Sequence, residues 1–264
     1  MANITLNTKH VYGLLATVCA LSFSTAHAGP RDDNVRIGLN VPYEPFEYHK
    51  PGGQLEGFDV ELGNALCEQA KLKCTWNEQS WDSLIPGLMS RKNDAIMSAM
   101  TISDERKQQI LFSEPYLVQP SAWFAPADAK LSEADLKNLS GKRIGVQRGT
   151  MQDNYLTDLY GKRNDIKRYA SADDFVIDLQ SGRLDLAFTD YPTGKYTLLD
   201  AADSKGKFMI VGEKVNDSKY FGEGYGIAFR KRDAALAARF NDALKEVKQN
   251  GTYQKLLDKY FPEQ

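Results

Sequence analysis

The sequence has few of the residues from which metal sites and nucleophilic active sites are built. Its 264 residues include three cysteines and three histidines, and these form no cluster with the spacing of zinc ligands. The one histidine after the first 28 residues, His49, lies in a charged loop, far from any nucleophile-like turn. We therefore expect no metal, no cofactor and no hydrolase of the Ser-His-Asp kind.

An excess of charge of one sign is also missing. The chain has 33 Lys and Arg residues against 35 Asp and Glu residues, a formal net charge of −2, and no basic run. A nearly balanced surface argues against nucleic acid as a partner, and the lack of a basic run argues against a membrane surface. The expected partner is a small molecule or another protein.

Long apolar runs are confined to the N-terminus. The first 28 residues carry one charged residue, Lys9, followed by the mostly apolar residues 11–24 and an Ala-His-Ala motif that ends at Ala28. This pattern predicts a signal peptide, residues 1–28, that is cleaved after Ala28, and hence export. An uncleaved anchor is the alternative, although the run is short for a membrane span. The residues from 29 to 264 are enough for one large or two small domains.

Two cysteines, Cys67 and Cys74, follow the signal segment at a spacing of seven residues. They lie between a helical pattern that begins near Phe58 and a strand expected at 73–79. In an oxidising compartment this spacing suits a disulfide between the helix end and the strand, worth about 2 kcal/mol for so small a loop. In a reducing compartment the alternative is two core thiols.

Apolar strand patterns alternate with amphipathic helical patterns through most of the chain, which predicts an α/β fold. The expected strands are 35–40, 73–79, 95–100, 143–147, 166–170 and 184–189. The helical patterns begin near Phe58, Trp81 and Ser103, cover 131–139, begin again after Gly149, cover 172–180, and end with two helices that start near Leu236 and Tyr253. Open α/β sheets bind ligands beyond the carboxyl ends of their strands, so the residues that follow each strand are the candidates for a site.

The strongest candidate follows the strand expected at 95–100. Ser103, with two acids behind it, predicts a helix N-cap and places Arg106 in the first helical turn. The guanidinium of Arg106 can hold a carboxylate through two parallel hydrogen bonds, and Thr101 offers a hydroxyl and an amide beside it. The sequence therefore indicates capture of a small carboxylate. The alternative for Arg106 is a surface arginine paired with a nearby acid.

Other residues occupy comparable positions, and most of them have a structural alternative. Tyr43 lies in a proline-containing loop after the first strand. Its two possible roles are to contact a ligand and to anchor the loop as a partly buried residue. Trp81 begins a helix after Ser80, and its side chain could either contact a ligand or cover the core. Thr150 follows a glycine turn that can present backbone N–H groups to an anion, and the Walker lysine spacing is missing. Asp190 is placed to hold an ammonium group or to cap the next helix.

Several motifs together resemble the periplasmic amino-acid-binding proteins of ABC importers, the family 3 solute-binding proteins, and in particular the lysine/arginine/ornithine and histidine binders. The motifs are VRIGLNVPYEPFEY, LEGFDVELGNALC, WDSLIPGL, DAIMSAMTISDERKQQI, GKRIGVQRGTMQ, SGRLDLAFTD, KYFGEGYGIAFRK and NGTYQKLLDKYF. The resemblance spans the chain after the signal segment. It implies a periplasmic monomer that delivers an amino acid to an inner-membrane ABC permease.

The fold implied by this resemblance is the type II periplasmic-binding-protein fold, an α/β fold of two lobes with two hinge crossings and a ligand cleft between the lobes. Lobe 1 is expected at 29–118 and 216–264, and lobe 2 at 122–213. The short connections between these ranges would act as hinges.

The resemblance also implies roles for the candidate residues. Arg106, Thr101 and the Ser98 carbonyl of lobe 1 would meet Thr150 and Asp190 of lobe 2 around a free amino acid. Asp190 would hold the α-ammonium group, opposite the carboxylate at Arg106. Lobe closure alone completes these contacts, so the ligand would favour the closed form that an importer recognises.

The side chain of the ligand is less well defined by the sequence. Tyr43 and Trp81 would enclose it from two faces. In binders of basic amino acids the first strand ends with an acid, and here Asn40 replaces it, which weakens the case for lysine. Asn40, Gln147 and Gln152 would form a neutral polar lining that suits arginine, histidine, citrulline or glutamine.

Two features favour alternatives. Ala99 replaces a serine common in the relatives and makes room opposite Trp81, as in opine-binding members, although Asp190 argues against a substituted α-nitrogen. Glu44 or Glu47 is an alternative source of charge for a cationic side chain such as that of lysine or ornithine. A dehydratase of cyclic carboxylic acids, with Asp190 as acid/base, and a soluble sensory module are readings of other classes. We expect a binding protein and not an enzyme.

Overall fold

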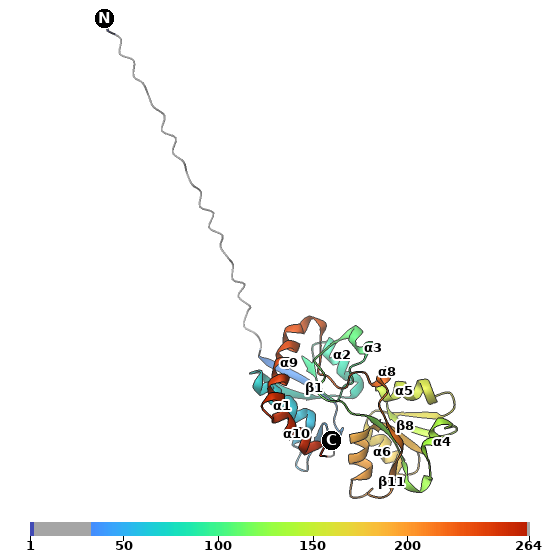
Figure 1. The fold of residues 1–264 in the computed structure, drawn as a ribbon. Helices are drawn as coiled ribbons and strands as arrows, with labels where there is room; N and C mark the ends of the chain where they lie inside the picture. Colours follow the sequence, from blue (N-terminus) through green and yellow to red (C-terminus); the bar gives the residue numbers. More distant parts are fainter. Residues whose placement is uncertain (3–32, 263–264) are drawn as a thin grey trace. The chain divides into compact units, whose positions relative to one another are not determined.

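The computed structural model describes residues 1–2 and 33–262, and the chain divides into two units, residues 1–32 and 33–264. The predicted cleavage site after Ala28 and residues 3–28 of the predicted signal peptide lie outside the described residues. Within the described residues, no helix is long and apolar enough to cross a membrane. Figure 1 shows the fold of the second unit from β1 to α10.

The first sheet has the strand order β4-β1-β5-β12-β6. Its parallel part consists of β1 (Asn34–Leu39) between β4 (Lys73–Glu78) and β5 (Ala95–Ile96). The short strands β12 (Ala228–Phe229) and β6 (Leu111–Phe112) extend it in antiparallel fashion. The carboxyl ends of β1 and β5 therefore lie at the same edge, and this brings the residues that follow them together.

Helices from distant parts of the chain cover the first sheet. In Figure 1, α1 (Phe58–Gln69), α9 (Ala234–Gln249) and α10 (Thr252–Tyr260) lie against one another. The buried residues of α9 are Ala237, Phe240, Ala243, Leu244 and Val247, so the helix buries one apolar face, as its amphipathic pattern predicts. The other elements of this first-sheet half are β2 (Tyr48–His49), β3 (Leu55–Glu56), η1 (Trp81–Ser83), α2 (Leu84–Met89), α3 (Asp104–Gln109) and η4 (Lys231–Asp233).

The second sheet has the order β11-β7-β10-β8-β9. Strands β8 (Arg143–Gln147), β9 (Asp165–Tyr169) and β10 (Leu186–Asp190) are parallel, and β7 (Ser121–Pro126) pairs antiparallel with β10 and β11 (Phe208–Val215). The other elements of this second-sheet half are η2 (Ala127–Ala129), α4 (Glu133–Lys137), α5 (Met151–Tyr160), α6 (Ala172–Gln180), α7 (Tyr191–Gly194), the π-helical turn η3 (Lys195–Leu199) and α8 (Ser218–Phe221).

The α/β organisation predicted from the sequence is confirmed, with one instructive error. The expected strand at 143–147 and helix at 172–180 have the same bounds in the structure, as β8 and α6. The strand expected at 95–100 is wrong beyond Ile96. Ala99 has a φ of +44°, in the left-handed region, so the backbone turns there. The apolar run of this segment reflects burial in the core, not continued strand pairing.

The chain passes from the first sheet to the second between β6 and β7 and returns between β11 and β12. On the return, Tyr220 of α8 packs edge-on against Tyr155 of α5, with 5.1 Å between ring centroids. Tyr225 then forms isolated β-bridges with Thr101 and Leu117. The lobe boundaries expected from the sequence stay a prediction.

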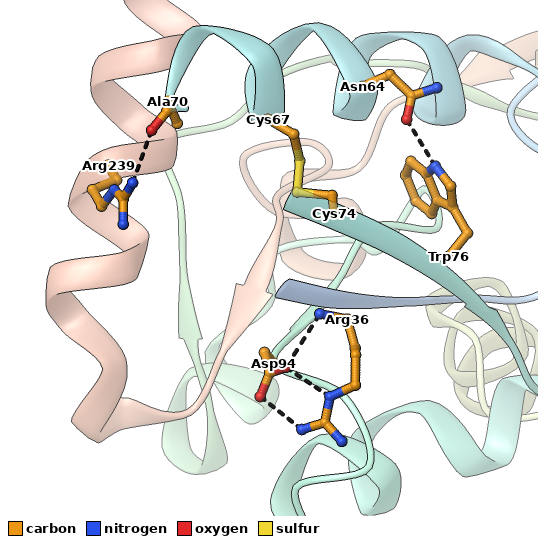
Figure 2. The surroundings of a disulfide bond; sticks show 8 residues. All are labelled: Arg36, Asn64, Cys67, Ala70, Cys74, Trp76, Asp94 and Arg239. Atoms are coloured by element: carbon orange, nitrogen blue, oxygen red, sulfur yellow. Dashed lines mark hydrogen bonds and ion pairs between the residues drawn. A yellow bond between two sulfur atoms is a disulfide. The ribbon is translucent and has the colours of Figure 1, made fainter. Parts of the chain in front are cut away.

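The disulfide predicted from the cysteine spacing joins α1 to β4 (Figure 2). Cys67 and Cys74 have their Cα atoms 6.1 Å apart. Nearby, the Trp76 indole N–H of β4 donates a hydrogen bond of 2.9 Å to the Asn64 side chain of α1. A covalent bond and a hydrogen bond therefore tie the same helix to the same strand.

Candidate functional site

All the residues predicted to contact a ligand line one pocket. They follow strands of both sheets, so the carboxyl edges of the two sheets supply the pocket's walls. The predicted residues are Asn40, Tyr43, Trp81, Ser98, Ala99, Thr101, Arg106, Gln147, Thr150, Gln152 and Asp190. Met151, at the start of α5, also lines the pocket and belongs to a hydrophobic core cluster, and the sequence analysis did not single it out.

Arg106 is buried and held by backbone oxygens. The backbone N–H of Arg106 donates to the Ser103 hydroxyl, so the predicted N-cap is confirmed. The guanidinium donates to the Thr101 carbonyl through Nη1 at 2.9 Å and to the Gly149 carbonyl through Nη2 at 3.3 Å. Burial lowers the Arg106 pKa to about 10, which leaves the group protonated at neutral pH. The alternative of an exposed arginine is wrong, since the side chain is 8% exposed.

Asp190 ends β10 and is equally buried. The Tyr43 hydroxyl donates to its Oδ2 at 2.6 Å, and the Gln152 amide donates to its Oδ1 at 2.6 Å. Burial raises the Asp190 pKa to about 6, against the lowering effect of hydrogen bonds from hydroxyl groups such as that of Tyr43. Although Asp190 occupies the N-cap position of α7, its side chain makes no capping hydrogen bond. The capping alternative for this carboxylate is therefore wrong.

Thr150 caps α5 with its hydroxyl. Its Oγ1 accepts from the Asp153 N–H at 3.2 Å and donates to the Gln147 carbonyl at 2.8 Å. The preceding Gly149 has a φ of +71°, a conformation that favours glycine, and this turn directs its carbonyl oxygen at the first-sheet half. The sequence indicated backbone donors at this turn, but it gave no sign of the Gly149 oxygen as an acceptor.

The two aromatic residues, Trp81 and Tyr43, make different contacts. The Trp81 indole N–H donates to the Gly149 carbonyl at 3.1 Å, and its ring centroid is 5.4 Å from the Arg106 guanidinium carbon. Tyr43 stacks on Phe46, with ring centroids 5.8 Å apart. Tyr43 is thus a buried anchor of its loop as well as a lining residue.

The polar lining crosses between the halves. Asn40 donates through Nδ2 to the Gln79 carbonyl at 3.0 Å and accepts at Oδ1 from the Gln147 amide at 2.9 Å. Its own N–H donates to Ser98 Oγ at 2.9 Å. Neither Glu44 nor Glu47 lines the pocket, so the alternative in which they supply charge to it is not supported.

Two further acids, Glu47 and Asp59, are buried without lining the pocket, and the sequence analysis considered only Glu47, as an alternative source of charge. Ser98 Oγ donates to the Glu47 carboxyl. The Ala99 N–H donates to Asp59 Oδ2 at 2.7 Å, and the Tyr116 hydroxyl donates to the same oxygen at 2.7 Å. Among residues 1–2 and 33–262, no group of three or more His, Cys, Asp or Glu side chains is arranged to hold a metal ion.

Known proteins resemble this chain over most of its length. The model of the bacterial extracellular solute-binding proteins, family 3, matches residues 35–263. The L-arginine-binding protein of Pseudomonas aeruginosa is 43% identical over 245 residues, which cover 92% of this chain and 93% of the relative. The lysine/arginine/ornithine-binding periplasmic protein of Escherichia coli is 38% identical over 248 residues, which cover 94% and 95%. The solved structure of a Salmonella typhimurium periplasmic binding protein of high arginine specificity matches with a TM-score of 0.78 and 33% identity, covering 86% of this chain and 99% of that chain.

Proposed function

This chain belongs to the bacterial extracellular solute-binding proteins, family 3, with the predicted type II periplasmic-binding-protein fold, and we propose that it captures a free amino acid of the arginine class for an ABC permease. The observation that carries the proposal is a pocket lined by one buried guanidinium, Arg106 of α3, and one buried carboxylate, Asp190 of β10. A free amino acid carries the complementary charges at a fixed separation.

In this proposal the ligand's carboxylate meets Arg106, Thr101 and the N-terminus of α5 at Thr150, while its α-ammonium group meets Asp190 and the Ser98 carbonyl. The Arg106 side chain is already directed by the Thr101 and Gly149 carbonyls, which leaves the remaining N–H groups of the guanidinium for an anion. Asp190 is ionised at neutral pH, because its pKa of about 6 lies below that pH, and an ammonium group would stabilise the ionised form further.

Arginine is the ligand that the lining favours. A guanidinium is a planar donor that neutral amide oxygens such as those of Asn40 and Gln147 can accept, and flat rings at Tyr43 and Trp81 suit its faces. A lysine ammonium is a compact charge that calls for an acid, and Asn40 supplies none. The relatives named for arginine support this choice, and the space at Ala99 keeps an opine as the second candidate of the same class.

The proposal includes the predicted periplasmic location, cleavage after Ala28, a monomer, and closure of lobe 1 (29–118 and 216–264) on lobe 2 (122–213). The hydrogen bonds between the halves support closure as part of binding. One hydrogen bond runs from the Gln147 amide to Asn40, and another runs from the Tyr43 hydroxyl to Asp190. Separating the halves would break these contacts and open a path for the ligand.

The proposal is tested by a thermal-shift panel on the mature protein after removal of bound ligand. The panel contains arginine, lysine, ornithine, histidine, glutamine, citrulline, octopine and prephenate. A ligand at about 100 times its dissociation constant stabilises the folded state by about 2.7 kcal/mol, a clear melting shift. We expect the largest shift with arginine, retained by an Arg183→Ala control, whose exposed side chain pairs with Asp178, and lost in Arg106→Ala.

Other outcomes of the panel would change the proposal. A response to octopine and not to arginine names the ligand class as opines. Consumption of prephenate replaces binding with a dehydratase activity. No response to any amino acid, or an undiminished response in Arg106→Ala, overturns the proposed site.

A further inference from the structure

A second pocket lies where the chain crosses between the two sheets, and we propose that it binds a small aromatic carboxylate and thereby favours amino-acid binding. Val118, Gln119 and Pro120, of the connection between β6 and β7, form part of its wall, so we call it the crossing pocket. Its volume is about 280 Å³, close to the range of roughly 300–1,000 Å³ that is usual for small-molecule sites. It shares no lining residue with the pocket of Arg106 and Asp190.

The apolar walls of the crossing pocket are largely aromatic. Tyr191 and Tyr196 come from the second-sheet half, and Tyr260 and Phe261 come from the end of the first-sheet half. Tyr196 is 45% exposed and Val118 is 56% exposed, so both belong to the few large hydrophobic side chains that the described residues leave in contact with water. Covering these surfaces with an aromatic ring would remove apolar area from water.

The charged groups of the crossing pocket favour an anion. Lys195 Nζ pairs with Asp200 Oδ2 at 2.6 Å, which balances one of the two lysines that line the pocket. The other is Lys214, whose Nζ lies 3.4 Å from the centroid of the Tyr191 ring and forms no ion pair within residues 33–262. An ammonium group has three N–H donors and the ring covers one side of it, so donors remain for a carboxylate.

Gln119 supplies a second donor. It is buried at the crossing, and its amide nitrogen has no hydrogen-bond partner among the residues that the structure describes. The Tyr191 N–H donates to the carbonyl of the next residue, Pro120, at 2.8 Å, so Gln119 and Lys214 both lie at the Tyr191 end of the pocket. A buried donor without an acceptor is unfavourable, and a ligand oxygen at this end would provide one.

A free amino acid does not match this lining. Of the described residues that line the crossing pocket, Asp200 is the one acid, and it already pairs with Lys195. An α-ammonium group would therefore have no carboxylate of its own and would be repelled by Lys214. A molecule with an aromatic ring and a carboxylate but no amine fits both the rings and the charge.

Neighbouring residues connect the crossing pocket with the pocket of the proposed function. Tyr43 lines the pocket of the proposed function, and Pro45, two residues later in the same loop, lines the crossing pocket. Asp190 and Tyr191 are consecutive, and they line the pocket of the proposed function and the crossing pocket, respectively. A displacement of either segment therefore affects both pockets.

Both halves of the molecule contribute walls to the crossing pocket. Contact between the halves continues beside it, where the rings of Tyr48 and Tyr196 have their centroids 5.9 Å apart. A molecule that touches both halves stabilises their present arrangement, and the proposed closure around an amino acid requires the same arrangement. This coupling rests on the proposed function. Because linkage is reciprocal, each ligand should lower the Kd of the other, by about fivefold for a typical coupling.

Binding to the crossing pocket is tested first without amino acid, with 2-naphthoate as the probe. Titration calorimetry on the mature protein should show one site for 2-naphthoate and none for 2-naphthalenemethanol, which has the ring without the carboxylate. We expect Lys214→Met to raise the Kd for 2-naphthoate by about fivefold, as for an exposed ion pair. Lys245→Met, at an exposed lysine of α9 outside the pocket, is the matched control and should leave the Kd unchanged.

Gln119→Leu separates a ligand role from a structural role. Its amide nitrogen has no partner to lose, so the free energy of unfolding in urea should not fall, whereas 2-naphthoate should bind about fivefold more weakly. No binding of 2-naphthoate at concentrations up to about 10 mM overturns the crossing pocket, as does equal affinity in wild type, Lys214→Met and Gln119→Leu.

Two further titrations locate the site and test the coupling. Arg106→Ala should still bind 2-naphthoate, and saturating 2-naphthoate should lower the Kd for arginine by about fivefold. Loss of 2-naphthoate binding in Arg106→Ala, or competition between the two ligands, would place the probe in the pocket of the proposed function and overturn the proposal. An unchanged Kd for arginine overturns the coupling. If wild-type protein binds 2-naphthoate but no amino acid, the proposed function fails and the crossing pocket stands.

Discussion

The two charged ends of the pocket are built in different ways. Arg106 is held by backbone carbonyl oxygens, while Asp190 is held by side-chain donors, a tyrosine hydroxyl and a glutamine amide. Within residues 33–262, neither forms an ion pair with a residue of opposite charge. Each end satisfies its hydrogen bonds with neutral groups and keeps its charge for a ligand, an arrangement that leaves both charges poorly compensated when the pocket is empty.

The difference between the ends lies in how firmly each charge is fixed. Burial lowers the Arg106 pKa to about 10, so the guanidinium stays charged throughout the neutral range. Burial raises the Asp190 pKa to about 6, so its charge is present above that pH and absent below it. The arginine end is a permanent anchor, and the aspartate end is conditional on pH.

Replacing the permanent anchor should have the largest effect. Arg106→Met keeps much of the side chain's volume but removes the charge and its paired donors. We expect it to weaken arginine binding by about 3–5 kcal/mol, measured by titration calorimetry. Arg106→Lys should lie between wild type and Arg106→Met, because it restores the charge without the planar fork. Equal affinities for Arg106→Met and wild type would show that the ligand's carboxylate binds elsewhere.

Replacing the conditional end should separate binding from stability. Asp190→Asn removes the charge, and we expect a loss of about 2–4 kcal/mol in arginine binding. The folded-state pKa of Asp190 lies above that of the unfolded chain, so the wild-type, ligand-free protein loses stability as pH rises from about 4 to about 6. At neutral pH and without ligand, the free energy of unfolding of Asp190→Asn, measured in urea, should therefore be about 1–3 kcal/mol higher than that of the wild type. A variant that loses both binding and stability would contradict this account.

The pH dependence of binding sharpens the same comparison. Arginine affinity should be constant above about pH 6 and fall by about tenfold per pH unit below it, since Asp190 must then lose a proton to bind an ammonium group. The profile should be flat over this range in Asp190→Asn. A fall that persists in Asp190→Asn would assign the titration to another group.

Specificity between arginine and lysine should depend on Asn40. The Asn40→Asp variant would place a carboxylate beside the Gln147 amide, which still donates to it, and we expect lysine and ornithine to bind about tenfold more tightly. The gain is limited because the new side chain can no longer donate to the Gln79 carbonyl. Unchanged or lower lysine affinity, measured by the same titration, would show that position 40 does not face the ligand's side chain.

The residues at both ends of the pocket could be predicted because their signals are local. A cap residue three positions before Arg106 and a strand that ends at Asp190 are visible in a few residues of sequence. The family resemblance then named their partners around the ligand. The same resemblance named Asn40 and Gln147 as part of a neutral polar lining, and the structure places both at strand ends.

The contacts that set the charges of these residues could not be predicted. The Tyr43 hydroxyl reaches Asp190 across 147 positions in the chain, and Gly149 lies 43 positions from Arg106. Such pairs depend on how the two halves pack, and a short sequence pattern does not predict that packing. Glu47 was considered as an alternative source of charge in the pocket, but it is fully buried and does not line the pocket.

The smallest effect should come from an exposed ion pair between the halves. Arg148, after β8, pairs with Asp82 of η1, and their side chains are 52% and 44% exposed. Exposed pairs contribute about 0–1 kcal/mol and are screened by salt, so Asp82→Asn should weaken arginine binding by less than about fivefold at low salt and not at all in about 1 M salt. Asp165→Asn, which breaks an exposed pair with Lys167 inside the second-sheet half, is the control and should not change affinity. Suppose that Asp82→Asn instead weakens binding as much as Asp190→Asn. The surface ion pair, and not the buried charges, would then hold the halves together. The difference between the two ends of the pocket would have little effect on binding.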